Sequence, residues 1–300
     1  VDMKVRFAVS PPRSALKDAE YPLYLDECER LGFDTMWLSD IPLGGLGDPL
    51  INLTFAAAYT SRLKLGANLV PLGRHPYWLA KQLAQLDRLS HGRLLISLVP
   101  GLGQPAERKA LGYPTGNRGK VVDEMIALMR RWWAGEIVNQ QWCGYEFEDI
   151  VLDPTPMQEP LELWLGGISA MALERVANLA DGWLTSAATP AEAGAGRTEI
   201  ERRAEEIGRV VDIDHFGISI PYCLEKPKEI ALDNLRRRRK DRDLTDIVAV
   251  GATELRRLTK AHIDEGLSKF VVRPLDVLSN TAPWRDDLRW LADVVLPLQT

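Results

Sequence analysis

The chain has 300 residues, of which 46% are apolar and 26% charged, and its net charge is −5. This length and composition suit one soluble α/β barrel, and the acidic charge argues against a nucleic-acid partner. No apolar run approaches the roughly 20 residues that span a bilayer, so no membrane association is expected. Three widely spaced cysteines form no disulfide framework, and the N-terminus has no secretion-signal pattern, so we expect a reducing, cytoplasmic setting.

The first part of the chain alternates between short apolar strands and helices. Lys4–Val9 is predicted to be a strand, and a helix follows it up to Leu31, where Gly32 ends it. The run Asp34–Leu38 predicts a second strand that ends at Ser39 and Asp40. After a loop rich in glycine and proline, Pro49–Thr60 is predicted to be a helix.

The clearest unit lies between Lys64 and Gly101. Lys64–Val70 reads as a buried strand, and Pro76 is suited to the first position of the next helix. The leucines of that helix fall on one face, and a second apolar strand covers Leu94–Val99. This pattern predicts a right-handed β-α-β unit with two parallel strands.

The second half continues the alternation after a long connection, Pro100–Asn117, which predicts an irregular and functional loop. A strong helix is expected over Arg118–Ala134, and a small hairpin within residues 136–160. The strand Leu161–Leu165 turns directly into the helix Ala170–Ala180 through Gly166–Ser169. The remaining expected elements are strands near residues 183–185, 215–223 and 270–273, and helices near 192–209, 226–240, 253–265 and 284–298.

The resulting count is eight strands, nearly all followed by a helix. This alternation predicts an α/β fold, a (β/α)8 TIM barrel with insertions in its βα loops. With no internal repeat and no low-complexity linker, we assign residues 1–300 to a single domain. In such barrels ligands bind at the carboxyl ends of the strands, which directs attention to the side chains there.

Four features stand at predicted strand ends, and each has a structural alternative. Gly166–Ser169 resembles a phosphate-binding turn at a helix N-terminus, or is a tight turn that Ser169 caps. Asp40 is a candidate general base, or it caps a turn. His75 is a candidate proton donor or acceptor, or a histidine satisfied at a helix start. Arg273 is a candidate anion ligand, or part of a surface ion pair.

Other familiar chemistries have no support in the sequence. The four histidines have no metal-binding spacing, and neither a P-loop nor a nucleophile elbow is present, so no metal site is expected. The basic run Arg236–Lys240 is interpreted as a solvated helix face, because acidic residues flank it in an acidic chain.

Several segments in combination carry a family resemblance. They are GFDTMWLSD (Gly32–Asp40), RHPYWLAKQLAQLDRLSHGRL (Arg74–Leu94), ERKALGYPTGNR (Glu107–Arg118), the run Pro154–Trp183 and EGLSKFVVR (Glu265–Arg273). In this order they resemble the bacterial luciferase-like flavin monooxygenase superfamily, in particular its F420-dependent oxidoreductase branch. The resemblance covers nearly the whole chain and implies the same TIM barrel.

The resemblance also implies a cofactor site. The flavin-type ring would lie over the third strand at Asn68, Leu69 and Val70, in a cavity bordered by Asp40, His75 and Gly101. Many members have a bulge and a non-prolyl cis peptide there, so irregular backbone is expected at this strand end. Gly166, Gly167, Ile168 and Ser169 would hold the cofactor phosphate.

The implied function is hydride transfer between F420 and a small organic substrate, with His75 or Asp40 moving the proton. The alternatives are an FMN-dependent monooxygenase of the alkanal or alkanesulfonate type, and a flavin-binding protein without turnover. The last is kept because Ile41 follows Asp40 where many relatives have histidine. A cofactor-free lyase or isomerase would need a paired acid and base at strand ends, and no lysine or glutamate stands out there. The resemblance further implies a homodimer, for which the helix Pro49–Thr60 would fit either the interface or the core.

Overall fold

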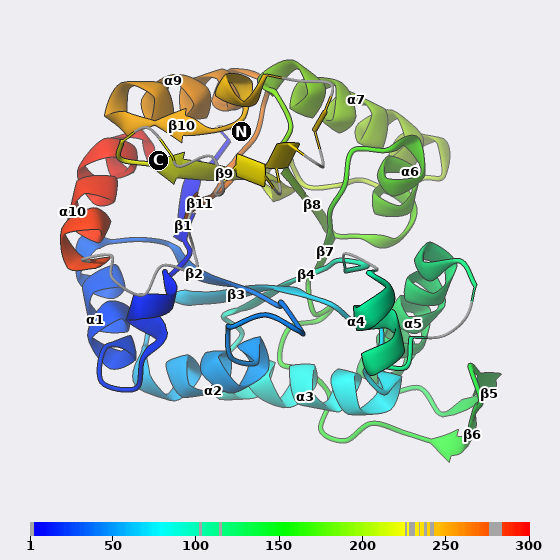
Figure 1. Cartoon of the computed structure of the whole chain (residues 1–300). Coiled ribbons are helices and arrows are strands. Elements are labelled where there is room, and N and C mark those ends of the chain that lie inside the picture. The colour runs from blue at the N-terminus through cyan, green and yellow to red at the C-terminus, as the bar shows by residue number, and fades with distance from the viewer. Residues whose placement is uncertain are drawn as a thin grey trace.

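The computed structural model describes residues 3–101, 104–113, 116–225, 243–275 and 284–300, together with 227, 232, 233, 235, 236, 239 and 240. Its parallel strands form one closed barrel surrounded by helices (Figure 1). The barrel strands are β1 (Arg6–Val9), β2 (Thr35–Ser39), β3 (Lys64–Leu69), β4 (Leu94–Leu98), β7 (Leu163–Leu165), β8 (Gly182–Ser186), β9 (Phe216–Cys223) and β11 (Lys269–Pro274).

The strand order closes the barrel without a free edge. It runs β9-β11-β1-β2-β3-β4-β7-β8, and β8 pairs again with β9. Every neighbouring pair is parallel, as short apolar strands connected by helices predict. The predicted (β/α)8 barrel and its eight strands are therefore confirmed.

Helices form the outer ring (Figure 1). The α-helices are α1 (Tyr21–Leu31), α2 (Pro49–Tyr59), α3 (Pro76–Leu89), α4 (Pro105–Ala110), α5 (Arg118–Trp133), α6 (Ala170–Leu179), α7 (Pro190–Glu206), α9 (Gly251–Asp264) and α10 (Trp284–Val295). Proline occupies a first-turn position in five of them, namely α1, α2, α3, α4 and α7, where its missing N–H has no acceptor to lose. None of the described helices is long and apolar enough to cross a membrane.

Two elements differ from the sequence-based expectation. Helix α4 lies within the segment that was predicted to be an irregular loop, because Pro105 starts a short helix that ends before Gly112. A further two-residue strand, β10 (Ala249–Val250), pairs with β9. The expected hairpin is present as β5 (Val138–Trp142) and β6 (Tyr145–Ile150), whereas most of the helix expected over 226–240 lies outside the described residues.

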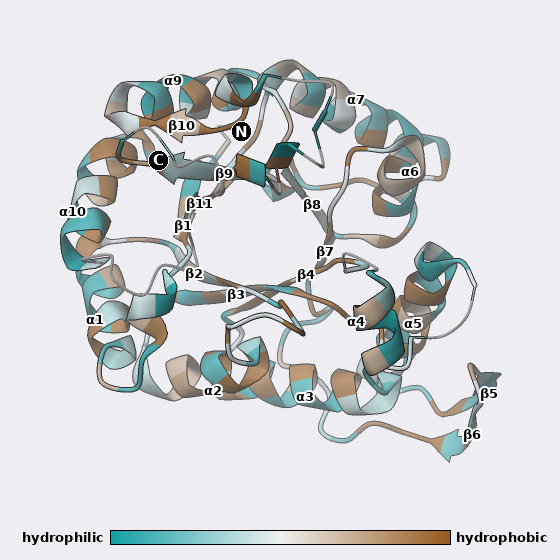
Figure 2. Ribbon diagram, viewed as in Figure 1, coloured by the Kyte–Doolittle hydropathy of each residue, from teal (hydrophilic) through white to brown (hydrophobic). Residues whose placement is uncertain are grey.

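Two compartments of the core position the site, and a third, small cluster groups Ala187, Leu232, Leu235, Ile247 and Val248. The larger lies between the strands and the helices, most of which are hydrophobic on the inner face and mixed in hydropathy on the outer face (Figure 2). The smaller fills the barrel interior, and we call it the barrel plug; its members are Ala8, Trp37, Leu95, Trp164, Leu184 and Val271. Packed side chains therefore close the barrel below its carboxyl ends.

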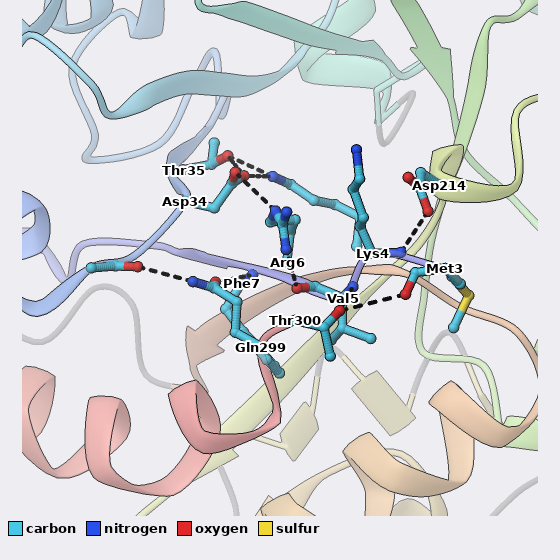
Figure 3. A network of polar contacts seen from close by, with 12 residues as sticks. Met3, Lys4, Val5, Arg6, Phe7, Asp34, Thr35, Asp214, Gln299 and Thr300 are labelled. Carbon is cyan, nitrogen blue, oxygen red and sulfur yellow. Dashed lines mark hydrogen bonds and ion pairs between the residues drawn. The ribbon is translucent and has the colours of Figure 1, made fainter. Parts of the chain in front are cut away.

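A polar network closes the amino end of the barrel (Figure 3). Buried Lys269 forms an ion pair with Asp34 and donates to Thr35 Oγ1 at 2.6 Å. Burial alone would raise the pKa of Asp34, but the positive charges of Lys269 and Lys64 lower it overall. The backbone N–H of Thr300 donates to the carbonyl of Val5 at 3.2 Å, which fastens the last residues to β1.

Candidate active site

The plug residues show which side chains of each strand face the barrel interior. A Cβ built on Gly66 would lie 2.1 Å from Cε3 of Trp37, so Gly66 faces the interior. Side chains alternate along a strand, so the position two residues after each plug residue also faces inward, nearer the carboxyl end. The outward positions between them belong to the larger core compartment, as Ala67 and Ile96 do.

This alternation produces a ring of mostly small polar residues above the plug, which we call the polar ring. Six members lie two residues after a plug residue, and two, Asn68 and Ser219, lie two residues after the inward-facing glycines Gly66 and Gly217. The members are Ser10, Ser39, Asn68, Ser97, Gly166, Ser186, Ser219 and Arg273. Asn68 lies between Ser39 and Ser97 in the register of β2, β3 and β4. The hydroxyls of Ser10 and Ser97 are buried and have no hydrogen-bond partner among the described residues. The floor of the carboxyl-end mouth is therefore able to bind a ligand through hydrogen bonds.

The side chain of Asp40 binds the backbone at the end of β3. Its side chain is only 5% exposed, and its Oδ2 accepts from the backbone N–H of Val70 at 3.1 Å and from Nη2 of Arg74 at 3.0 Å. The same guanidinium contacts Asp48 at 3.1 Å and donates from Nε to the Val70 carbonyl at 3.3 Å. Burial would lower the pKa of Arg74, but the charges of Asp40 and Asp48 raise it overall. Both backbone groups of Val70 are thus fixed by this clamp.

The expected irregularity at Asn68–Val70 is wrong. The register of β3 continues through Leu69 on the β4 side, and Val99 N–H donates to the Leu69 carbonyl at 2.9 Å. The cis peptide bonds among the described residues both precede proline, at Pro154 and Pro160. The reason is that the neighbouring strands and Asp40 form hydrogen bonds with the backbone groups of this segment, so that no bulge is needed. Of the three residues proposed as the ring bed, Asn68 points into the mouth, whereas Leu69 and Val70 are buried and belong to the larger core compartment.

His75 turns away from the mouth. It stands at the N-cap of α3, and its ring packs against Tyr145 of the hairpin with 4.4 Å between ring centroids. The hairpin β5–β6 lies outside the barrel (Figure 1). Burial lowers the pKa of His75, and its Nδ1 has no partner among the described residues. His75 and Asp40 make separate contacts, His75 with the hairpin and Asp40 with Val70 and Arg74, and the proton-transfer role of either residue stays a prediction.

Gly101 packs against Val70 and a buried pair that the sequence reasoning missed. It has a φ of 67°, and a Cβ built on it would lie 2.8 Å from Oε1 of Glu107 and 3.1 Å from Cγ1 of Val70. Glu107 is 6% exposed and accepts from the Tyr113 hydroxyl at 2.7 Å. Burial and this carboxylate raise the pKa of Tyr113. The sequence signal for this pair was an acidic residue, Glu107, in the first turn of a short helix that Pro105 begins.

The turn Gly166–Ser169 lies open at the end of β7. Gly167 has a φ of 103°, and its carbonyl accepts from Nε1 of Trp183 at 2.9 Å. Ser169 caps α6 by accepting from Ala172 N–H at 3.3 Å, and Ile168 is 38% exposed. The first N–H groups of a helix have no acceptor within it, so this exposed end suits an anion. The geometry is compatible with both the capped turn and the phosphate site.

Metal ligation has no counterpart in the parts of the chain that the structure describes. No group of three or more histidine, cysteine, aspartate or glutamate side chains is arranged there to hold an ion.

Comparisons with solved structures agree with this barrel. The F420-dependent tetrahydromethanopterin reductase from Methanopyrus kandleri superposes with a TM-score of 0.75 at 17% identity over 100% of both chains. The FMN complex of the oxygenating constituent of 3,6-diketocamphane monooxygenase from Pseudomonas putida has a TM-score of 0.77 at 18% identity over 99% of both chains. At these identities the likeness concerns the fold.

Sequence comparison adds the family. Limonene 1,2-monooxygenase from Rhodococcus erythropolis is 29% identical over 240 residues, covering 75% of this chain and 62% of that enzyme. An uncharacterized protein of Mycobacterium tuberculosis is 32% identical over 142 residues, 46% of this chain and 50% of its own length. The chain thus spans less than two thirds of either relative. The model of the luciferase-like monooxygenase family matches residues 19–268, and the chain therefore belongs to that family.

Proposed function

We propose that this protein is an oxidoreductase that binds a flavin-type cofactor, F420 in the first instance, at the carboxyl mouth of its barrel and acts on a small organic molecule. The observation that carries the proposal is the polar ring above the apolar plug, in a chain of this family. Solved enzymes with the same fold are described with F420 or with FMN.

The residues present fit such a group. The unpartnered hydroxyl of Ser97 and the side chain of Asn68 are suited to the carbonyl and N–H edges of a flavin-type ring. The exposed N-terminus of α6 and the turn Gly166–Ser169 would hold its phosphate. Gly101 would border the ring, with Leu69 supporting it from behind through the sheet. The cofactor would supply the hydride chemistry.

The chain's own contribution is position and exclusion of water. The clamp of Asp40 and Arg74 would fix Val70 at the edge of the site, and the plug would seal the barrel beneath it. Because Asp40 already accepts two hydrogen bonds, we assign it a positioning role ahead of proton transfer.

A second candidate is FMN-dependent monooxygenation. It is favoured by the likeness to limonene 1,2-monooxygenase over 75% of the chain. A flavin-binding protein without turnover is the remaining alternative. It is supported by Ile41, which stands after Asp40 where many relatives have histidine.

The test is cofactor identification. The purified protein is denatured, and any released chromophore is identified by mass and absorption spectrum. Equilibrium dialysis then compares F420 and FMN, each oxidised and reduced. We expect F420 to bind more tightly than FMN; the reverse order would favour the monooxygenase. Binding of neither cofactor would overturn the proposal.

The same purified protein separates turnover from binding. With the preferred cofactor bound, a panel of small alcohols, ketones and alkenes is screened for oxidation or reduction of the cofactor. Turnover of any member supports an enzyme, and binding without turnover across the panel supports the non-catalytic alternative.

A further inference from the structure

A small cavity opens beside the polar ring, at the carboxyl ends of β1 and β2. Its walls include the polar residues Ser10, Trp37, Ser39 and Asn52 and the leucines Leu16 and Leu46. The cavity has a volume of about 10 Å³, which is room for about one water-sized group. No charged side chain among the described residues lines this cavity.

Two polar groups on residues of this wall have no hydrogen-bond partner among the described residues. They are the hydroxyl of Ser10 and the indole Nε1 of Trp37, and both residues are buried, at 5% and 0% exposure. An unpaired buried polar group costs about 1–3 kcal/mol, so such groups normally have a partner.

The strand register brings the two residues together. Val9 pairs with Met36 in the ladder of β1 and β2, so Ser10 and Trp37 stand opposite each other at the next position. Both residues line the same cavity. An indole N–H can only donate, whereas a serine hydroxyl can donate or accept. A ligand oxygen that accepts hydrogen bonds would therefore satisfy both groups.

We propose that this cavity binds the oxygen end of the substrate, a small uncharged and mostly apolar molecule whose carbonyl or hydroxyl oxygen accepts from Trp37 Nε1 and contacts the Ser10 hydroxyl. The cavity admits a single oxygen-sized group, and the carbon skeleton would lie at its opening beside Leu16 and Leu46. A charged substrate is disfavoured, because no side chain of the wall would compensate its charge. This assignment of substrate class rests on the proposed function, since it places the substrate beside the cofactor mouth.

Nuclear magnetic resonance of the ¹⁵N-labelled indoles tests the assignment in the purified full chain. The probes are cyclohexanone and methylenecyclohexane, which have nearly the same shape but differ in the oxygen. The Trp37 signal is identified with Trp37→Phe, or from contacts to Gly66 protons in the unmutated protein if that variant does not fold. We expect cyclohexanone to move this signal downfield and to saturate, and the hydrocarbon to leave it nearly unchanged.

Variants then separate the oxygen contact from a general packing effect. Ser10→Ala should weaken cyclohexanone binding about fivefold to tenfold, the size of one hydrogen bond, without changing hydrocarbon binding. The matched control is Thr185→Val, whose hydroxyl is also buried and unpartnered but points out of the barrel. An unmoved Trp37 signal would mean that only water satisfies the two groups. That result, equal binding of both probes, or an equal loss in Thr185→Val would overturn the inference.

Failure of this inference is distinguishable from failure of the proposed function. The titrations are run with and without cofactor, and cofactor binding is measured separately by equilibrium dialysis. A silent Trp37 signal together with intact cofactor binding overturns only the substrate assignment. Absent cofactor binding overturns the proposed function, while the Trp37 response still reports on the cavity.

Discussion

Asp40 illustrates how a carboxylate at a strand end is used by the backbone. In the sequence it reads as a free acid before a glycine-rich loop. In the structure it holds Val70 N–H and the guanidinium of Arg74. Arg74 lies far from Asp40 in sequence, on the loop after β3, so no local pattern could show the pair.

Replacing this carboxylate separates a positioning role from a proton-transfer role. Asp40→Asn should lower the free energy of unfolding by about 1–3 kcal/mol, because a charged acceptor of two buried hydrogen bonds is lost. Cofactor affinity should fall with it, as measured by denaturant unfolding and equilibrium dialysis. Asp18→Asn, at an exposed site, should change stability by less than about 0.5 kcal/mol. Unchanged stability with a lost limb of the pH profile of turnover would instead identify Asp40 as a proton carrier.

His262 on α9 makes stability depend on pH. It is 2% exposed, and burial lowers its pKa from 6.5 to about 4. Between these values the unfolded chain holds a proton that the folded chain does not, so the free energy of unfolding falls as pH falls. The loss across the window is about 3 kcal/mol.

Unfolding measured in urea from pH 7 to pH 4 checks this effect. His262→Leu should flatten the pH dependence in this window, even if its stability at pH 7 differs. His91→Gln, at an exposed histidine, should keep the original slope. If the His262→Leu slope equals that of the unmutated protein, the depressed pKa of His262 is contradicted.

At the scale of elements, the loop between β4 and α4 packs tightly against the end of β3. Gly101 and Gly112 both have positive φ, at 67° and 61°. A Cβ on Gly101 would meet Glu107 and Val70, whereas a Cβ on Gly112 would have nothing within 4 Å. The two glycines therefore separate backbone strain from crowding.

The pair gives a matched experiment. Gly112→Ala should cost about 1 kcal/mol, the strain of a left-handed alanine. Gly101→Ala should cost about 1–3 kcal/mol more, because Glu107 or Val70 must move, and it should also weaken cofactor binding. Urea unfolding measures the first effect and equilibrium dialysis the second. Equal stability costs at both positions would show that the loop accommodates a methyl group.

Helix α2 carries an exposed apolar stripe. Ile51, Phe55 and Tyr59 are 71%, 45% and 44% exposed, and the rings of Phe55 and Tyr59 stack with centroids 5.7 Å apart. Leu53 and Ala56 of the same helix are fully buried, so α2 faces the core on one side. A helix that is apolar on both sides favours a partner on the outer one.

The homodimer therefore stays a prediction with a defined surface. Light scattering after size exclusion should give about twice the chain mass of 33.6 kDa. Phe55→Glu should shift the protein to the monomer, because a charge would be buried in the interface. Val210→Glu, at a residue that is 91% exposed elsewhere, is the control. A monomeric mass for the unmutated protein would contradict this use of α2.

On the scale of the whole molecule, the two ends of the barrel have different roles: the carboxyl end is suited to binding a ligand, and the amino end stabilises the fold. The carboxyl end has unpartnered hydroxyls, whereas the amino end is closed by the pair of Lys269 and Asp34. Burial lowers the pKa of Lys269, and Asp34 partly offsets this. Lys269→Met would leave Asp34 buried without its main partner.

This change should lower the free energy of unfolding by about 3–5 kcal/mol. The pKa of Asp34 should rise, because the first charge that opposes burial is removed. In the unmutated protein the depressed pKa of Asp34 gives stability that is lost as pH falls through the folded value. In Lys269→Met this loss should shrink, so the free energy of unfolding, measured in urea from pH 7 to pH 3, should be lower at pH 7 but fall less steeply with pH. Lys260→Met, at an exposed lysine, is the control. Loss of cofactor affinity in a folded Lys269→Met protein would contradict the separation of the two ends.

The sequence predicted the fold well because strands and helices are encoded locally. Apolar runs bounded by proline and glycine located all eight barrel strands. The site was harder, because its contacts join distant segments. His75 faces Tyr145 of the hairpin, a contact that no spacing indicates. The regular β3 depends on both neighbouring strands. The polar ring, by contrast, lies two residues after the inward-facing residue of each strand, so the alternation along the predicted strands could have located it.

The pairing of β1 with β11 has a consequence for synthesis. Arg6–Val9 leave the ribosome long before their partner Lys269–Pro274, because most of the barrel lies between them in the sequence. Until β11 is made, the edge of β1 that pairs with it stays unpaired. The sheet is then an open barrel with exposed apolar faces. Closure is therefore a late event in the life of each new chain, and a nascent chain stalled before β11 would be the form most in need of a chaperone.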